Sequence, residues 1–454
     1  MKKSILTAFA LMAVSSLSAA PRITFQGSSK QVITVNPDKN TGLNNVYVVY
    51  DASQLTSMTI SGVSSSAQIS KYSNLGGGYA QSVNTTVSGS DIIVENPEGN
   101  MGYIIDDSGS STYIWIVNYL PYKLRLTAAS SYTQQDCDNT MITVDGEGSP
   151  INYYTIDGRP VELDREIKVS YHNLEWSEDD EQYLQIEDGK SLSHLSETII
   201  LTPPLYCNST VTVSGDRFLK AWNLEEEIES PVIQANGLEV HTKAIQTNLP
   251  SVDDPDAPAS NMIRTETEGM GGSAPADISF TAFTTDAVLH NEWQIASDPE
   301  FEYLLYRFNE QNVDYSFTEE GTFYVRFVGS NADGTCETFG DTYTVTIGAS
   351  DLRIPNAFTP NGDGVNDEWK VAYRSLLSFK CWIFDRYGTE IFKFEDPTQG
   401  WDGKYKGKLV SPGVYFYVIE AQGADGKKYK KGGDINLVRS KRYGESTAGG
   451  TTTE

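Results

Sequence analysis

Histidine and cysteine are both scarce in this sequence, with four of each among 454 residues. These residue types supply many of the nucleophiles, general bases and zinc ligands of enzymes. The four histidines form no HExxH pattern, and neither a GxSxG motif nor a phosphate-binding glycine loop is present. We therefore predict that the protein is not an enzyme. A catalytic triad assembled from distant residues remains open, because its members meet in space and not in sequence order.

Positive charge is also in short supply. The chain has 34 Lys and Arg against 61 Asp and Glu, a formal net charge of −27 and a pI near 4.5. Such a chain repels phosphate backbones, so we expect no nucleic-acid partner. The imbalance is uneven, because residues 351–454 hold 16 basic and 14 acidic side chains. The acidic excess therefore lies in the preceding 350 residues.

Long hydrophobic runs are missing apart from one short stretch near the N-terminus. Lys2 and Lys3 precede an apolar run over residues 5–14, and small residues follow as far as Ala20. This is the pattern of a secretory signal peptide over residues 1–20, and it is too short for a membrane anchor. No cysteine follows directly, so a lipid anchor is not expected. The mature protein is predicted to be exported and not integral to a membrane.

The four cysteines form no CxxC pair, which argues against a zinc ribbon or a thioredoxin-like site. Export favours disulfide formation. We expect Cys137 and Cys207 to bridge the two sheets of one predicted sandwich, with two buried thiols as the alternative. A bridge between Cys336 and Cys381 would require two different predicted domains to pack closely, so their pairing stays open.

Helix signals are scarce too, whereas short β-rich runs separated by Gly, Ser and Asp turns recur along the chain. The predicted fold class is all-β, with tandem Ig-like or PKD-like β-sandwiches. Asp298–Arg307 is the best helix candidate, with Asp298 as its cap and Pro299 in its first turn. The expected domains are a β-sandwich over 21–128, an Ig-like sandwich over 129–248, a linker over 249–276, a PKD-like or Ig-like domain over 277–349, a last domain over 350–440 and a disordered tail over 441–454.

The most informative segment is residues 354–369, which read IPNAFTPNGDGVNDEW. Pro355 and Pro360 impose an extended backbone around Phe358. The Asn-Gly-Asp-Gly run that follows supplies positive-φ positions for a tight loop. The hairpin WIFDRYGTEIF, the turn GWDG, the strand SPGVYFYVIE and the closing GDINLVR come next. Together these segments predict a compact Ig-like sandwich of about seven strands.

This stretch closely resembles the gliding-motility-associated C-terminal domain, the type B sorting domain of the Bacteroidota type IX secretion system. The resemblance covers about residues 350–440. It implies export, passage across the outer membrane to the cell surface, and two partners, namely the type IX translocon and an outer-membrane barrel of the PorP/SprF-like family. Chains with this domain usually stop soon after the final strand, whereas this one continues to residue 454.

The candidate sorting and docking residues follow from this resemblance and from a late cluster of lysines. They are Pro355, Asn356, Phe358, Pro360, Asn361, Gly362, Asp363, Gly364, Asn366, Asp367, Trp401, Asp402, Gly403, Lys427, Lys428, Lys430 and Lys431. The lysines form either a docking surface for an acidic partner or an ordinary solvated face. Phe358 either anchors the partner or fills the core of its own domain.

The same loop contains a candidate calcium site at Asn361, Asp363 and Asp367. Hard oxygen ligands around a glycine-rich turn suit Ca²⁺. No glutamate stands at the position where such a loop usually closes, and Asx-turn hydrogen bonds would explain the same residues. No other cofactor is expected.

The sequence leaves two functions open. The first is a non-enzymatic surface protein, held by its last domain to a PorP/SprF-like barrel and acting as a structural adaptor of the secretion or attachment machinery. The alternative is an adhesin that binds a glycan or host protein through its N-terminal β domains. For a glycan, Tyr113, Trp115, Tyr119 and Tyr122 could form a stacking platform, although packing across the sheet is the favoured explanation for them.

Overall fold

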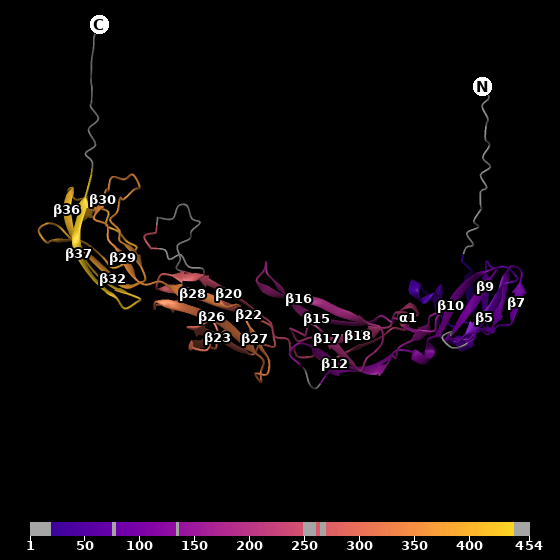
Figure 1. Cartoon of the computed structure of the whole chain (residues 1–454). Coiled ribbons are helices and arrows are strands. Elements are labelled where there is room, and N and C mark those ends of the chain that lie inside the picture. Colours follow the sequence, from indigo (N-terminus) through magenta and orange to yellow (C-terminus); the bar gives the residue numbers. More distant parts are fainter. Residues whose placement is uncertain (1–19, 75–78, 133–135, 248–259, 264–268, 440–454) are drawn as a thin grey trace, which may run out of the picture. The chain divides into compact units, whose positions relative to one another are not determined.

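The computed structural model describes residues 20–74, 79–132, 136–247, 260–263 and 269–439. Strands make up 54% of the structure and helices 4%, which confirms the all-β prediction. The chain divides into two compact units, residues 1–176 with 184–237 and residues 177–183 with 238–454 (Figure 1). Residues 1–19 of the predicted signal peptide, residues 249–259 and 264–268 of the predicted linker, and the predicted tail lie outside the described residues. None of the described helices has the length and apolar character needed to cross a membrane.

The first sandwich packs a four-stranded sheet against a six-stranded one. The strand order of the smaller sheet is β1(Arg22–Gln26)-β4(Ser57–Ser61)-β8(Asp91–Glu95)-β7(Thr85–Ser88), and that of the larger is β2(Ile33–Val35)-β3(Asn45–Val49)-β10(Ser110–Asn118)-β9(Met101–Asp107)-β5(Gln68–Tyr72)-β6(Gln81–Ser82). Every second side chain of β4 is buried, as expected for a strand with one face on a core. Met58 and Ile60 of β4 thereby join Ile105 and Ile116 of the larger sheet in that core.

The second sandwich has smaller sheets than the first and contains an α-helix. Its strands are ordered β11(Arg125–Ser131)-β12(Thr140–Glu147)-β17(Thr198–Leu201), β13(Asn152–Tyr154)-β14(Pro160–Glu162) and β16(Gln182–Leu192)-β15(Ile167–Ser177)-β18(Val211–Gly215)-β19(Glu226–Glu229). Helix α1 spans Arg217–Ala221, and the Asp216 carboxylate caps it by accepting a hydrogen bond from Leu219 N at 2.9 Å.

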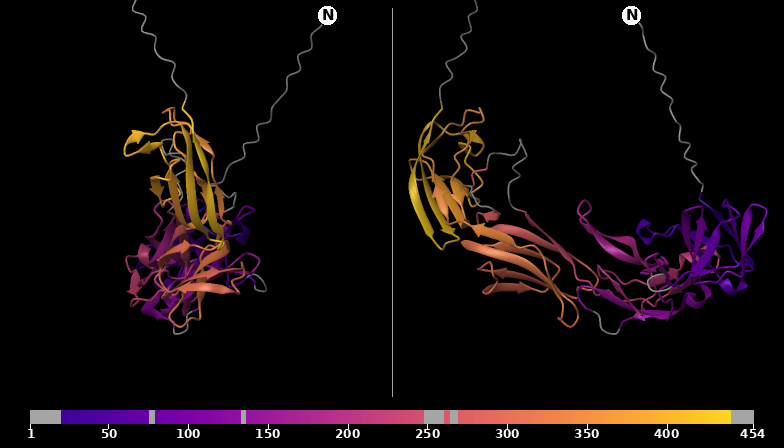
Figure 2. Two further views of the ribbon diagram at one scale, coloured as in Figure 1. Left: turned by 90° about the vertical axis from the view of Figure 1, so that its left-hand side faces the viewer. Right: turned by 45° about the vertical axis from the view of Figure 1, so that its right-hand side comes forward.

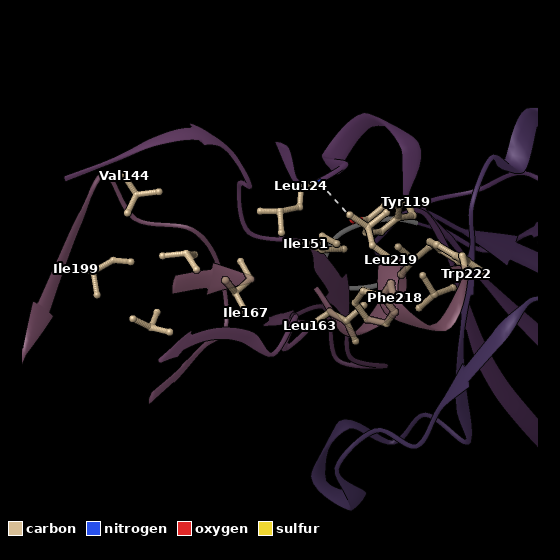
Figure 3. Packing of buried hydrophobic residues seen from close by; sticks show 14 of the residues in the cluster. Tyr119, Leu124, Val144, Ile151, Leu163, Ile167, Ile199, Phe218, Leu219 and Trp222 are labelled. Carbon is tan, nitrogen blue, oxygen red and sulfur yellow. Dashed lines mark hydrogen bonds between the residues drawn. The ribbon is translucent and has the colours of Figure 1, made fainter. Parts of the chain in front are cut away.

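One hydrophobic cluster runs through both of these sandwiches. Trp222, which follows α1, contacts the rings of Tyr50 and Tyr119 at 5.2 and 5.1 Å between centroids. Its indole Nε1 donates to Gln31 O at 2.7 Å. Figure 3 shows Trp222, Phe218 and Leu219 of the helix segment beside Tyr119 and Leu124. The two N-terminal sandwiches therefore share a hydrophobic core and do not pack independently of each other.

A buried ion pair lies at the centre of that shared core. Arg165 and Asp216 both have fully buried side chains, with Nε and Oδ2 at 2.8 Å. The Tyr119 hydroxyl donates to the same carboxylate at 3.0 Å, and the guanidinium also donates to Ser149 O and Tyr122 O. Desolvation by burial, and next the Asp216 charge, raise the pKa of Tyr119. The pair is thus bonded on most of its polar atoms, as a buried ion pair requires.

The third sandwich begins before the predicted linker. Its first sheet is ordered β20(Val240–Gln246)-β22(Ala276–Thr284)-β25(Asn312–Phe317), and its second β21(Met270–Gly272)-β28(Tyr343–Ile347)-β26(Gly321–Ser330)-β23(His290–Ala296)-β24(Leu304–Phe308), with β27(Glu337–Phe339) also on β26. Residues 270–276 supply a strand, and Ala274 and Ala276 enter the core. The expectation that the whole 249–276 segment is a linker is therefore wrong at its C-terminal end, because small side chains fit a tight core position there.

The helix expected over Asp298–Arg307 is also wrong. Asp298 does cap, but it closes a turn by accepting from Glu302 N and Tyr303 N at 2.9 and 2.8 Å. Phe301 has φ 60°, a left-handed conformation that no α-helix continues through. The chain then enters β24 and pairs with β23.

The last sandwich is built around one five-stranded sheet. Its order is β30(Ala357–Phe358)-β37(Lys428–Leu437)-β36(Gly413–Gly423)-β32(Leu376–Phe384)-β33(Glu390–Phe394), accompanied by the pairs β29(Asp351–Arg353)-β31(Ala372–Arg374) and β34(Lys404–Tyr405)-β35(Lys408–Leu409). The long strands are the yellow arrows of Figure 2. Phe358, Trp369, Trp401 and Ile419 are among the side chains buried against one face of this sheet.

Three residues, 348–350, connect the third sandwich to the last, and hydrogen bonds fix each of them. The buried Ser375 donates its hydroxyl to Gly348 O at 2.5 Å and receives Ala274 N at 3.2 Å. Arg374 Nε donates to Ala349 O at 2.8 Å. Ser350 accepts at its carbonyl from the Tyr429 hydroxyl at 3.0 Å. This junction is held by specific bonds and not only by chain continuity.

The predicted Cys137–Cys207 disulfide is wrong. Cys207 is a buried thiol whose Sγ donates to His172 O at 3.8 Å, whereas Cys137 is disulfide-bonded. The second sandwich closes around Cys207 as a small apolar side chain. Cys381 is likewise a buried thiol outside any disulfide, so it does not bridge to Cys336.

The aromatic platform suggested for the first domain is not exposed. Trp115 and Tyr119 are buried, and Tyr113 and Tyr122 pack against the same core. Because two of the four are buried and two are partly buried, these side chains pack in the core and do not form one exposed platform.

Candidate docking surface of the C-terminal sandwich

The opening motif of the last domain packs against the GWDG turn. We call the unit that residues 355–360, Trp369 and the GWDG turn form together the clasp. Trp369 and Trp401 exchange backbone hydrogen bonds at 2.9 and 3.0 Å, and Trp369 Nε1 donates to Pro355 O at 2.7 Å. Phe358 is buried, with its ring 5.3 Å from that of Trp401. Asn356 O accepts from Asn436 N at 2.8 Å and so ties the motif to the last strand. Of the two readings of Phe358, the core residue is the one that the structure shows.

The GWDG turn completes the clasp. Gly403 has φ 73°, and a Cβ there would lie 3.1 Å from Pro360 Cγ and 3.2 Å from Leu437 Cδ1. Only glycine fits this close approach without displacing its neighbours. The Asp402 carboxylate accepts from Lys404 N at 3.0 Å and pairs with Lys404 Nζ at 2.6 Å.

The candidate calcium loop is held by its own hydrogen bonds. Asp367 Oδ1 accepts from Asn361 N and Gly362 N at 2.8 and 2.7 Å, and Oδ2 accepts from Gly364 N at 2.8 Å. These backbone donors, with the one from Gly362 first, lower the pKa of Asp367. Asp363 Oδ1 accepts from Val365 N at 2.9 Å, and Asn366, at φ 52°, accepts from Thr359 N.

The carboxylate oxygens of this loop therefore already have donors, as in Asx turns. Within the described ranges, no group of three or more His, Cys, Asp or Glu side chains is arranged to hold a metal. Calcium at Asn361, Asp363 and Asp367 stays a prediction.

The lysine cluster lies at the opposite end of the last strand. Phe358 pairs with Leu437 at one end of β37, whereas Lys428 begins that strand at the other. Lys427, Lys428, Lys430 and Lys431 are all exposed. Lys430 Nζ lies 3.3 Å from Glu420 Oε1, and Lys427 Nζ lies 4.8 Å from the Tyr429 ring centroid. The structure thus places the predicted docking residues in three parts. Phe358, Trp401 and Gly403 are buried in the clasp, the loop over 361–366 is exposed, and the four lysines form an exposed basic hairpin.

The outer face of the five-stranded sheet carries an apolar strip that the sequence analysis missed. Val414, Phe416 and Val418 point outward from β36 and are 47%, 44% and 36% exposed. The register places Phe384 opposite Phe416 and Trp382 opposite Val418. On the other side of β36, Gly432 lies opposite Val418 and adds no side chain over it. We call these five side chains, Val414, Phe416, Val418, Trp382 and Phe384, the outer strip.

The basic hairpin continues the outer strip along the same face. Lys380 and Lys430 flank Glu420, and Ser378 and Lys428 flank Gln422, in the next two rows of the register. A shallow hollow of about 350 Å³ lies over these rows. The face therefore has an apolar centre and a basic end.

A signal for the outer strip was present in the sequence. A strand with one buried face alternates apolar and polar residues, but residues 414–419 read VYFYVI without a polar interruption. Such a run is typical of a strand covered on both faces. In the described part of the chain, the side chains on its outer face remain partly exposed.

Comparison with known families gives this domain its class. Residues 352–437 match the CHU_C type IX secretion signal domain, and residues 129–230 match a fibronectin type III domain. The C-terminal sandwich is thus a type IX secretion sorting domain, which confirms the predicted resemblance. It implies export to the cell surface and interaction with the type IX secretion machinery.

Comparisons over the whole chain add little. No curated protein matches. The solved structure of dimeric latent PorU from Porphyromonas gingivalis aligns with 74% of this chain and 36% of that chain, at 10% identity and a TM-score of 0.15. A TM-score this low supports no argument about fold or function.

Proposed function

We propose that this protein is a non-enzymatic adaptor of the bacterial surface, held by its last domain to an outer-membrane barrel of the PorP/SprF-like family. The observation that carries the proposal is the outer strip. Val414, Phe416 and Val418 are 47%, 44% and 36% exposed. Burying a fully exposed side chain of this kind is worth about 1.5–3 kcal/mol, so covering each of these would yield less than half of that free energy. A partner that covers the strip recovers that free energy.

The distribution of charge also favours docking through the face that carries the outer strip. The domains before residue 350 carry the acidic excess, whereas the last domain is close to neutral and its basic end lies beside the outer strip. A partner with carboxylates around an apolar centre would select this domain from the rest of the chain by the sign of its charge. Buried clasp residues such as Phe358 and Trp401 would act by holding the sheet in shape.

The first experiment tests the role of the whole domain. The full chain and a chain lacking residues 350–454 are expressed in a host with a type IX system, and surface and periplasmic fractions are compared. We expect the truncated chain to remain in the periplasm with its first three sandwiches folded. Truncated protein at the surface in normal amounts would overturn the proposal.

The second experiment tests the face. The double variant Phe416→Ser/Val418→Ser removes the centre of the outer strip, and Val365→Ser/Leu409→Ser removes two other exposed apolar side chains of the same domain, which are 62% and 53% exposed. We expect only the first to lower retention on the membrane. Lys428→Glu/Lys430→Glu should weaken retention and reduce its salt dependence, whereas Lys406→Glu/Lys408→Glu should not. Equal behaviour within each pair would contradict docking through this face.

A further inference from the structure

The third sandwich carries a polar trough on the outer face of its larger sheet. A hollow of about 500 Å³ lies over β23, β24, β26 and β27, within the size range of small-ligand sites. Its lining includes His290, Glu292, Gln294, Arg307, Asn309 and Glu337. We call this hollow the trough, and none of the sequence motifs or family matches assigns it a role.

The strand register explains why these side chains meet. Trp293 and Ile295 of β23 point into the core, so His290, Glu292 and Gln294 point outward. Gln294 lies opposite Arg307 of β24 and Arg326 of β26. Val328 lies opposite both Glu292 and Phe339, and Ser330 opposite both His290 and Glu337. Four strands therefore contribute to one continuous surface.

The floor of the trough is fixed in place by a chain of hydrogen bonds. Arg326 Nε donates to Gln294 Oε1 at 2.9 Å, and Gln294 Nε2 donates to Glu292 Oε1 at 2.5 Å. Arg307 Nη1 lies 3.5 Å from the other oxygen of Glu292. Planar groups held this way lose little conformational entropy when a ligand binds.

An aromatic side chain, Phe339, lies opposite the lining residue Val328 in the strand register and is also held in place. The Arg326 guanidinium lies 4.0 Å from the Phe301 ring centroid and 5.1 Å from that of Phe339. Phe301 is buried, whereas Phe339 remains 52% exposed. Phe339 therefore offers an apolar surface to a ligand while Arg326 steadies it.

Three polar side chains at the trough have donors or acceptors that could bind a ligand. Asn309 and Glu337 are exposed, and neither side chain makes a hydrogen bond to another described residue, nor does the Ser330 hydroxyl. The trough thus presents an amide, a carboxylate and a hydroxyl, which together donate and accept. A ligand that both donates and accepts at closely spaced points matches this set.

The charged residues of the trough restrict the chemical class of ligand that it can bind. Glu292 is paired with Arg307, and the remaining carboxylate, Glu337, is matched by the charge of Arg326 in the floor, so the trough has no net charge. Such a site offers no strong net attraction to an anion or to a cation. A neutral ligand rich in hydroxyl groups, with an apolar C–H face for Phe339, fits the mixture of donors, acceptors and exposed ring.

We propose that the trough is a binding site for a neutral glycan. Glu337, Asn309 and Ser330 bond its hydroxyl groups, and Phe339 stacks against one sugar ring. This site belongs to the third sandwich and does not include the buried aromatic residues of the first, and the inference does not depend on how the last domain docks.

The test uses the purified full chain on an array of neutral oligosaccharides, with acidic oligosaccharides and extended peptides as comparison probes. Glu337→Gln/Asn309→Ala and Phe339→Ser change exposed trough residues. Glu319→Gln/Asn312→Ala makes the same chemical changes at exposed positions outside the trough. Thermal unfolding of each variant verifies that it is folded.

We expect binding to neutral glycans that weakens at least about tenfold in both trough variants and is unchanged in the control. Absence of neutral-glycan binding at millimolar ligand, or binding that all variants share, would overturn the proposal. Binding confined to acidic glycans or to peptides would overturn it as well.

Discussion

At the scale of single residues, the buried Arg165–Asp216 pair has the largest expected effect. Arg165→Met removes the cation and leaves the Asp216 carboxylate buried, so we expect a loss of about 3–5 kcal/mol in the free energy of unfolding. Arg159 pairs with Asp157 at a similar distance, but both side chains are more than half exposed. Arg159→Met should therefore cost less than about 1 kcal/mol. Denaturant unfolding of the full chain measures both, and similar losses would contradict the role given to burial.

Thiol chemistry provides a second prediction at this scale. Burial raises the pKa of the Cys381 thiol to about 12, so almost no reactive thiolate exists near neutral pH. We expect Cys207 and Cys381 to resist maleimide labelling in the folded protein and both to react after unfolding without reductant. Mass spectrometry should then show two labels, and four labels would contradict the assignment.

Residue-scale predictions from the sequence succeeded where the cause was local. Gly403 and the Asn-Gly-Asp-Gly loop announce positive-φ turns, and the structure has them. The Cys137–Cys207 pairing was wrong because nothing in a sequence reports which cysteines approach each other in space. The Arg165–Asp216 pair was missed for the same reason, since its partners are 51 residues apart.

At the scale of elements, the 361–367 loop should respond to acid. The pKa of Asp367 lies below its ordinary value of 3.8, so its contribution to stability is complete above that pH and is lost as the pH falls through the lowered pKa. Asp367→Asn removes the charge and should lower the melting temperature of the last domain at neutral pH while reducing its loss on acidification. Melting curves between pH 2 and 7 measure this, and an unchanged acid response would contradict it.

A second variant of the same loop tests calcium binding. If the loop binds the ion, millimolar CaCl₂ raises the melting temperature of the wild type but not of Asp363→Asn. The oxygens of Asp367 already accept three backbone hydrogen bonds, so the alternative, a loop held by Asx turns alone, gives no such rise. A calcium-dependent rise that MgCl₂ does not reproduce would show that the ion displaces those donors.

Element predictions failed where tertiary pairing outweighed local signals. The Asp298 cap and Pro299 are true helix-start signals, yet the segment forms a turn and a strand because β23 offers a pairing edge. The uninterrupted apolar run of β36 shows the converse case. Its sequence indicates apolar side chains on both faces of the strand, and the structure adds that one of these faces is uncovered.

At the scale of the whole molecule, the shared core predicts that the first two sandwiches unfold together. Trp222→Ala removes a side chain that packs on Tyr50 and Tyr119, at a cost of about 3–5 kcal/mol. Hydrogen exchange should accelerate in both β10 and β18. Phe280→Ala, a comparable truncation in the third sandwich, should leave β10 unchanged. Acceleration of β18 alone would show that the two sandwiches are independent.

The domain count was easier to predict than the domain boundaries. Recurrent turns and strand runs indicate several sandwiches, and the ordered motifs of the last one specify its class. The boundary near residue 249 was misplaced because β20, which lies before it, pairs with β22 beyond it. Long-range pairing of this kind has no local signature.

The three-residue junction between the third and last sandwiches has a mechanical consequence. A surface protein held by its last domain and bound to a ligand at the trough would be pulled between those two points. The load would then pass through residues 348–350, and not through the first two sandwiches. Because Ser375, Arg374 and Tyr429 bond the carbonyls of Gly348, Ala349 and Ser350 side by side, these bonds would share the force. The junction would resist stretching until several bonds broke together, and it would then lengthen by only a short stretch of chain.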